Sequence, residues 1–126
     1  MKKYSADFET VTWLKNETYV WAWALCEIDN PDNIKIGNSI DTFFEEIQKE
    51  NCTLWFHNLK FDGEFILYYL LSNGFERIEN KKERKDKTFM TLISDMGLFY
   101  SLEIYFKVGN KSCKKVTIYD SLKIYF

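Results

Sequence analysis

The chain has 126 residues, a length typical of a single domain, and its 46% hydrophobic and 18% aromatic residues can build one core. The net charge of −2 excludes a generally basic nucleic-acid-binding protein, so such binding would need a local basic patch or metal ions. No apolar run approaches the ~20 residues of a membrane span, and a single proline argues against a disordered linker.

The first half of the chain alternates between strand and helix patterns. Residues 3–10 predict a strand that ends in an acidic segment, and the aromatic run at 18–28 predicts a second strand. A turn at 29–33 and a short strand at 34–37 follow. Apolar residues at helical spacing then predict a helix whose N-cap is Asn38 or Ser39. The apolar positions are Ile40, Phe43, Phe44 and Ile47.

The second half begins with a buried strand, predicted over residues 53–57. A helix is predicted to start near Lys60 or Phe61 and to stop at Asn73-Gly74. Three further strands are predicted at 88–94, 98–108 and 114–120, with turns at Gly97 and at Gly109-Asn110. Strands, a helix, a strand, a helix and strands in this order predict an α/β fold with a mixed sheet.

Two charged segments each allow two interpretations. Residues 77–87 form a dense run of mixed charge, which is either a solvated loop or a loop that contacts a phosphate backbone. The later basic segment is either a solvated hairpin or part of a surface that grips single-stranded DNA. Its lysines are Lys107, Lys111, Lys114 and Lys115, with no acid between them.

Two acids end the first predicted strand. Asp7 and Glu9 are two residues apart, so their side chains point to the same face, while Phe8 points into the core. Two like charges at close range are costly without a counter-charge, which Mg²⁺ or Mn²⁺ could supply to these hard oxygen ligands. The alternative is a solvated strand end with two exposed acids.

The segment from His57 to Phe65 follows a buried strand and opens a helix. Asp62 would lie in the first turn, where it either complements the positive helix end or faces Asp7 and Glu9 as a third carboxylate. Asn58 can donate to a phosphate or a sugar. Phe61 and Phe65 share one helix face, where they either stack on a base or pack in the core. His57 is the only histidine, so packing or hydrogen bonding is its expected role.

The three cysteines lack the spacing of metal ligands. We interpret Cys26, Cys52 and Cys113 as small hydrophobic residues in a reducing cytoplasm. A zinc site or a disulfide framework is the alternative.

Several segments together resemble the exonuclease domain of protein-primed family B DNA polymerases from phages and linear plasmids. The residues at 4–10 (YSADFET) and 56–63 (FHNLKFDG) resemble the first two exonuclease motifs of that family. The residues at 34–39, 73–75 and 118–123 resemble further segments of it in the same order, the last being its Ser/Thr-Leu motif. The resemblance spans nearly the whole chain.

The resemblance implies a fold, a function and a set of site residues. The fold would be a ribonuclease H-like mixed sheet flanked by helices, and the 126 residues would form one domain, the front part of a 3′→5′ exonuclease domain. Asp7, Glu9 and Asp62 would be catalytic and would hold Mg²⁺ or Mn²⁺ for phosphodiester hydrolysis in proofreading during DNA replication. Further residues would bind single-stranded DNA. These are Thr10, His57, Asn58, Phe61, Phe65, Ser121 and Leu122.

The family's third exonuclease motif, Tyr-x-x-x-Asp, is not found before Phe126. We therefore expect these 126 residues to lack the fourth metal-binding carboxylate, and we do not assign Asp120 to that role. We expect the domain to be incomplete and weak or inactive alone. Glu64 replaces a small residue of the family and brings a new charge to the second motif.

The missing part is expected to leave apolar surface exposed, which favours a homodimer or a protein partner such as the terminal protein, another replication protein or a host protein. The residues concerned are Tyr119, Ile124, Tyr125 and Phe126. The expected location is the cytoplasm of a host bacterium, without membrane contact. The alternative function is a non-catalytic phage or mobile-element protein that binds single-stranded DNA or a protein and acts as a regulator or inhibitor.

Overall fold

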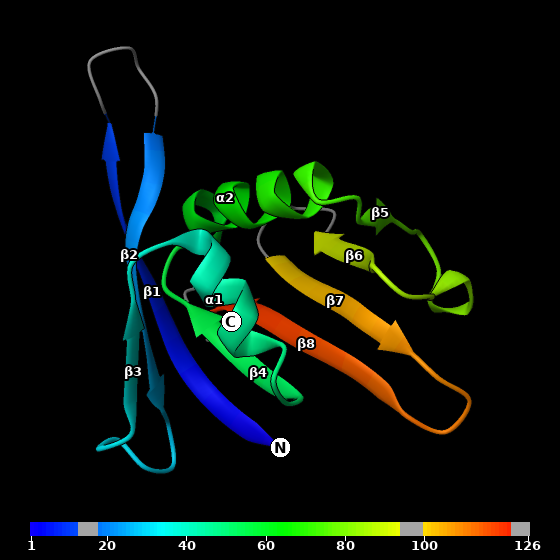
Figure 1. Cartoon of the computed structure of the whole chain (residues 1–126), viewed down its shortest axis with the longest axis horizontal. Helices are drawn as coiled ribbons and strands as arrows, with labels where there is room; N and C mark the ends of the chain where they lie inside the picture. The colour runs from blue at the N-terminus through cyan, green and yellow to red at the C-terminus, as the bar shows by residue number, and fades with distance from the viewer. Residues whose placement is uncertain (13–17, 94–99, 122–126) are drawn as a thin grey trace.

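The computed structural model describes residues 1–12, 18–93 and 100–121, and one sheet runs through them (Figure 1). The strands of this sheet are β1 (Lys2–Thr12), β2 (Thr18–Glu27), β3 (Ile34–Gly37), β4 (Cys52–Phe56), β5 (Glu76–Arg77), β6 (Thr88–Ile93), β7 (Tyr100–Val108) and β8 (Cys113–Asp120). The helices are α1 (Ile40–Ile47), α2 (Leu59–Ser72) and the short 3-10 helix η1 (Lys81–Glu83).

The sheet is mixed, with the strand order β3-β2-β1-β4-β8-β7-β6-β5. At its centre β1, β4 and β8 are parallel, so the carboxyl ends of β4 and β8 lie at the same edge. β5 and β6 are also parallel, whereas the other neighbouring strands are antiparallel. The predicted α/β fold with a mixed sheet is therefore confirmed.

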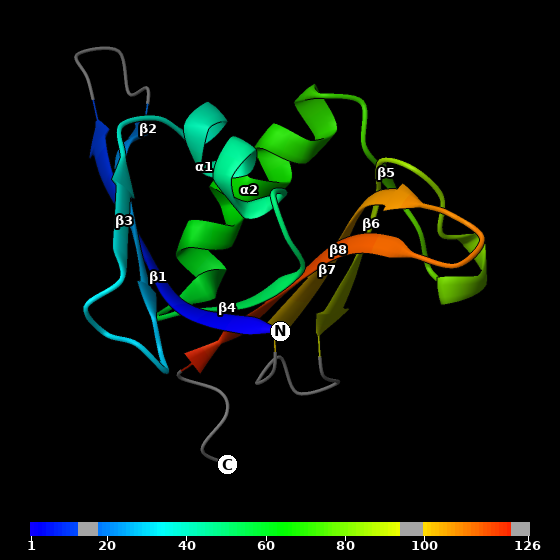
Figure 2. The same cartoon turned by 60° about the horizontal axis from the view of Figure 1, so that its bottom comes forward.

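Both α-helices lie on one face of the sheet (Figure 2). Tyr4, Ala6 and Phe8 alternate along β1 and are buried against this layer, as the period of two in a strand requires. The Phe8 ring meets Phe43 of α1 edge-on at 4.8 Å, and both helices contribute to the main hydrophobic core. Asp7 and Glu9 alternate with these residues, so they face away from the helices, and both are exposed.

The helix boundaries follow the predicted signals. The side chain of Ser39 accepts the Thr42 N–H at 3.2 Å, so Ser39 is the N-cap of α1. α2 starts at Leu59, one or two residues earlier than predicted, and stops at Asn73. Gly74 follows with φ of 82°, a left-handed conformation that glycine adopts without steric cost.

The predicted turns at 29–33 and at Gly109-Asn110 are confirmed by backbone hydrogen bonds. Gly97 lies outside the described residues.

The charged segment 77–87 is more ordered in structure than a plain solvated loop. Arg77 belongs to β5, and residues 81–83 form η1. Ile78 is buried in a second small cluster with Met90 and Tyr105, which anchors this segment to the sheet. The prediction of a loop was wrong at this point, because one apolar side chain among many charges is enough to dock the segment. The charged side chains from 79 to 87 are exposed, as predicted.

All three cysteines are free thiols; Cys52 is buried, whereas Cys26 and Cys113 are half-buried. Cys52 is buried beneath α1, and burial raises the pKa of its thiol to about 11. In the part of the chain that the structure describes, no helix is long and apolar enough to cross a membrane.

Candidate functional site

The first two acids lie where β1 runs past the end of β4. The last pair between these two strands is Ala6 with Phe56, and β1 continues to Thr12. Asp7 and Glu9 therefore lie just beyond the carboxyl end of β4, on the sheet face opposite Phe8. A bulge follows Glu9, and the half-buried Thr10 begins the altered register with β2.

Asp62 reaches this edge from the first turn of α2. Its side chain is only 6% exposed, and its carboxylate accepts a hydrogen bond from the backbone N–H of Phe8. This N–H is available because β4, the neighbour of β1 on that side, has already ended. The hydrogen bond ties the start of α2 to the middle of β1, between Asp7 and Glu9.

The pKa of Asp62 depends on its burial and on the groups around it. Burial raises its pKa most, the negative charge of Asp7 adds to the rise, the Phe8 hydrogen bond opposes it, and Glu9 raises it further. The result is a pKa of about 6, against an ordinary value of 3.8. Asp7 and Glu9 are thus both close enough to repel an ionised Asp62.

In residues 1–12, 18–93 and 100–121, no three His, Cys, Asp or Glu side chains form a ready-made group that could hold a metal ion.

The segment after β4 carries the next candidate residues. His57 and Asn58 are exposed, and Asn58 has a left-handed backbone (φ 66°) and makes no side-chain cap hydrogen bond to α2. Ser121, directly after β8, donates a hydrogen bond to the carbonyl oxygen of Phe56 at 3.2 Å. The carboxyl ends of β4 and β8 are thereby held together, with Ser121 beside His57. Leu122 lies outside the described residues.

Phe61 and Phe65 lie on the same face of α2. Their ring centroids are 5.6 Å apart with an angle of 73° between the planes. Phe61 is 50% exposed, so it is not a core residue, whereas Phe65 is half-buried against the main core. Phe65 thus supports Phe61 from the protein side and leaves one ring open to solvent.

Asp120 ends β8 and is almost completely buried. It is in register with Phe56 of β4, which is in register with Ala6 of β1, so its side chain points to the helix-covered face. It therefore does not share the open face with Asp7 and Glu9. The sequence placed Asp120 in the strand-end motif at 118–123 but did not predict its burial, because the burial follows from the pairing of β8 with β4 and not from any local pattern.

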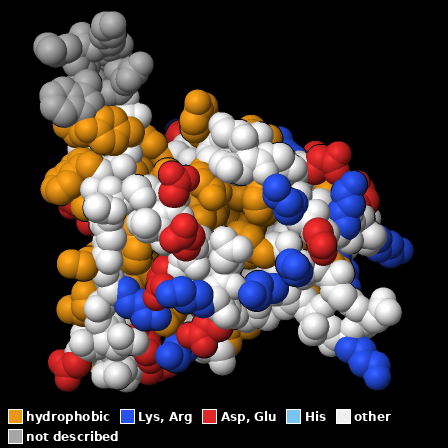
Figure 3. Space-filling model, in the orientation of Figure 1, with side chains coloured by type: hydrophobic (Ala, Val, Ile, Leu, Met, Phe, Trp, Pro, Cys, Tyr) orange, Lys and Arg blue, Asp and Glu red, His pale blue; other side chains and the backbone are white. Residues whose placement is uncertain are grey.

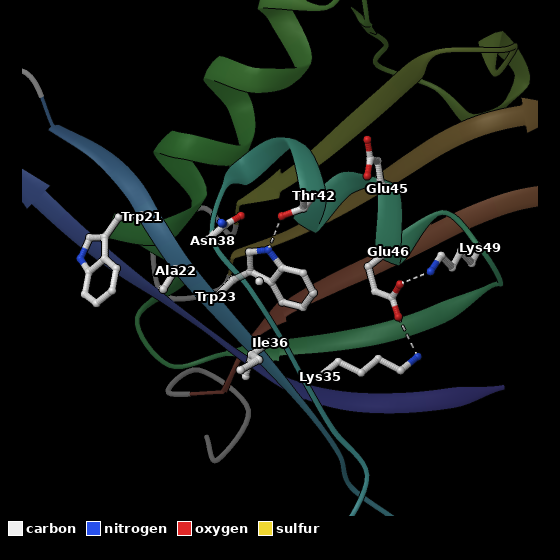
Figure 4. Close-up of a pocket in the computed structure, with 11 residues that line it drawn as sticks. Trp21, Ala22, Trp23, Lys35, Ile36, Asn38, Thr42, Glu45, Glu46 and Lys49 are labelled. Carbon is white, nitrogen blue, oxygen red and sulfur yellow. Dashed lines mark hydrogen bonds and ion pairs between the residues drawn. The ribbon is translucent and has the colours of Figure 1, made fainter.

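A separate cavity of about 700 Å³ opens between β2, β3 and α1 (Figure 4). Several of its polar side chains pair with one another: Trp23 Nε1 donates to Thr42 Oγ1 at 3.0 Å, and Glu46 pairs with Lys35 and Lys49. None of the three acids lines it. The chemistry of the candidate site therefore lies at the carboxyl edge of the sheet.

The expected apolar surface near the C-terminus is described in part. Tyr119 is half-buried and stacks on Trp55, with 5.7 Å between the ring centroids. Ile124, Tyr125 and Phe126 lie outside the described residues.

The chain is similar in sequence to DNA polymerases of phages. The DNA polymerase of Bacillus phage Nf is 44% identical over 122 residues, which are 97% of this chain and 21% of that polymerase. The DNA polymerase of Bacillus phage phi29 is 42% identical over 124 residues, and that of Streptococcus phage Cp-1 is 31% identical over 135 residues. No protein-family model matches the chain.

Solved structures agree with these relatives. Phi29 DNA polymerase complexed with primer-template DNA matches with a TM-score of 0.85, and the same polymerase complexed with single-stranded DNA matches with 0.83. Both are 39% identical and cover 97% of this chain and 21% of the polymerase chain. The chain is therefore homologous in sequence and fold to a segment of phage DNA polymerases, as predicted, and it spans about one fifth of their length.

Proposed function

We propose that this chain, homologous to a segment of phage DNA polymerases, forms part of a metal-dependent 3′→5′ exonuclease site of the protein-primed, family B kind. In this role it binds the 3′ end of single-stranded DNA and contributes to proofreading. The observation that carries the proposal is the hydrogen bond from the Phe8 N–H to Asp62, which brings an acid of α2 to the two acids of β1. With three carboxylates at hand, we expect the chain to be weak or inactive by itself.

The carboxylates are the residues that would hold a divalent metal ion. Asp7, Glu9 and Asp62 offer hard oxygen ligands, which suit Mg²⁺ and Mn²⁺. The repulsion that raises the pKa of Asp62 is the kind of cost that a cation would remove. When bound, a metal ion of this kind supplies an activated water and stabilises charge on the scissile phosphate.

Other residues at this edge would position the DNA strand. The amide of Asn58, which makes no cap hydrogen bond to α2, can donate to a phosphate or a sugar oxygen, and His57 precedes it in the chain. The exposed ring of Phe61 can stack on a terminal base, a contact that tolerates any sequence. Phe65 would hold that ring in place through its edge-on contact.

Two linked measurements test this proposal. Mn²⁺ binding is measured by electron paramagnetic resonance, and trimming of a 5′-labelled single strand is followed with Mn²⁺ present. We expect Mn²⁺ binding by the unaltered chain and its loss, with any trimming, in the double variant Asp7→Ala/Asp62→Ala. Glu64→Gln, an exposed acid two residues from Asp62, serves as the matched control and should keep Mn²⁺ binding.

The proposal fails if Mn²⁺ binding or trimming persists in the double variant. It also fails if the unaltered chain binds no Mn²⁺ at millimolar concentration. DNA binding that is indifferent to EDTA, with no Mn²⁺ binding, would instead support the non-catalytic alternative.

A further inference from the structure

Charge is distributed unevenly over the molecule. Residues 76–115 carry ten of the 17 basic residues but six of the 19 acids, so this part has a net charge of +4 and the rest −6. Figure 3 shows many Lys and Arg side chains over the side that carries η1 and the hairpin of β7 and β8. The overall charge of −2 conceals this separation.

The two basic segments are fixed against each other. The backbone N–H of Val108 donates to Asp86 at 2.8 Å, which ties the segment after η1 to the end of β7. On the other side of the hairpin, Asn51 accepts the Lys115 N–H at 3.0 Å and donates to the Cys113 carbonyl at 2.9 Å. The hairpin and the η1 segment therefore present their cations as one surface.

A cavity of about 280 Å³ opens between these segments. It is lined by Lys81, Arg84, Tyr105, Cys113 and Lys115. We call this cavity, which lies away from the three acids, the distal basic cavity.

The charges in and beside the distal basic cavity do not cancel. Glu103 accepts a hydrogen bond from the Tyr105 hydroxyl at 2.6 Å and pairs with Lys81 at 3.6 Å. Arg84 donates to the Lys81 carbonyl, which uses one of its five N–H groups. Neither Arg84 nor Lys115 forms an ion pair with a carboxylate of the described residues. A planar guanidinium with free donors next to an ammonium group is well suited to a phosphate.

We propose that the distal basic cavity binds a backbone phosphate of a nucleic-acid strand, at a second place remote from the 3′ end. The choice of a nucleic acid rests on the proposed function, because a strand whose end reaches the acids supplies further phosphates. Lys115 and Ser121 are separated by six residues of β8 and its end, which corresponds to roughly 20 Å. At 3.4 Å per stacked nucleotide, about six nucleotides span that distance.

Fluorescence anisotropy tests this proposal. It measures the affinity for a labelled 12-nucleotide single strand, in EDTA and over a range of salt concentrations. The variant Arg84→Gln/Lys115→Gln removes two charges from the cavity. At a salt slope of about 0.7 for the one phosphate contact, it should weaken binding about fivefold at 0.1 M salt and lower the slope by about 0.7. The variant Arg84→Lys/Lys115→Arg keeps the charges and should retain most of the binding.

The hairpin offers a matched control for diffuse electrostatic attraction. Lys107 and Lys114 are paired across β7 and β8, and Lys114 points to the opposite face of the hairpin from its neighbour Lys115. Lys107→Gln/Lys114→Gln removes the same charge but does not touch the cavity, so we expect less than a threefold loss. Thermal unfolding verifies that each variant is folded.

Equal losses in the two Gln variants would overturn the proposal, since they would indicate attraction without a site. No loss in Arg84→Gln/Lys115→Gln would overturn it as well. Polyglutamate that competes as well as DNA at equal charge would assign the cavity to an acidic protein instead. The binding measurement in EDTA is repeated with Asp7→Ala/Asp62→Ala. Retained DNA binding in this variant supports phosphate binding by the distal basic cavity even if the proposed nuclease site fails.

Discussion

Replacing Asp62 by Asn should stabilise the metal-free chain at neutral pH. Burial and the charges of Asp7 and Glu9 raise the pKa of Asp62 from 3.8 to about 6. In the unfolded chain this carboxyl ionises near its ordinary pKa. Between pH 3.8 and about 6 the native state therefore binds more protons than the unfolded state, and the stability of the native state falls as pH rises. An Asn side chain stays neutral, and its amide oxygen can still accept the Phe8 N–H.

The size of the effect follows from the two pKa values of Asp62. A difference of about 2.2 corresponds to about 3 kcal/mol, at 1.36 kcal/mol per pKa unit. This full value applies at pH 7.5, and about 0.5 kcal/mol remains at pH 4, where the carboxyl of the unfolded chain is only partly ionised. Solvent access to the site reduces these values, so we expect a gain of about 1–3 kcal/mol at pH 7.5.

The assay is urea unfolding in EDTA at pH 7.5 and at pH 4. Glu64→Gln is the control, because this exposed acid lies two residues along the same helix and should change the free energy of unfolding by less than about 0.5 kcal/mol. An Asp62→Asn variant no more stable than the unaltered chain at pH 7.5 would contradict this prediction. A gain of the same size at both pH values would also refute it.

Three further predictions concern the fold. Ser39→Ala removes the side-chain acceptor of the Thr42 N–H and should cost about 1 kcal/mol in urea unfolding; an unchanged midpoint would contradict this cap. Gly37→Ala would place a Cβ 2.3 Å from the Trp23 ring, so Tm should fall by several degrees, whereas an unchanged Tm would mean that the indole moves freely. In the native chain iodoacetamide should alkylate Cys52 more slowly than Cys26, because burial raises the pKa of the Cys52 thiol to about 11. Peptide mass spectrometry measures the two rates, and equal rates would contradict this prediction.

The local elements of the fold could be predicted from the sequence, since their signals are local. The aromatic run of β2 and the apolar spacing of α1 each lie within a dozen residues, and Ser39 marks the helix start. β5 could not be predicted, because its two residues are a strand only by pairing with β6. The burial of Ile78 likewise depends on Met90 and Tyr105, which are distant in sequence.

The candidate site was predictable in its residue types but not in its contacts. The spacing of Asp7 and Glu9 implied a shared face, and the position of Asp62 implied a first helical turn. The hydrogen bond from Phe8 to Asp62 depends on β4 ending where β1 continues, which is a property of the sheet. The distal basic cavity, too, exists only because the η1 segment is held against the β7–β8 hairpin.

Anomalous diffraction from a crystal grown with Mn²⁺ would locate the metal ion relative to the three acids. We predict a manganese peak within ligand distance of Asp7, Glu9 and Asp62, at about 2.0–2.4 Å from their carboxylate oxygens. Manganese bound only elsewhere on the molecule, or an Asp62 carboxylate turned away from the other two acids in the presence of Mn²⁺, would contradict it.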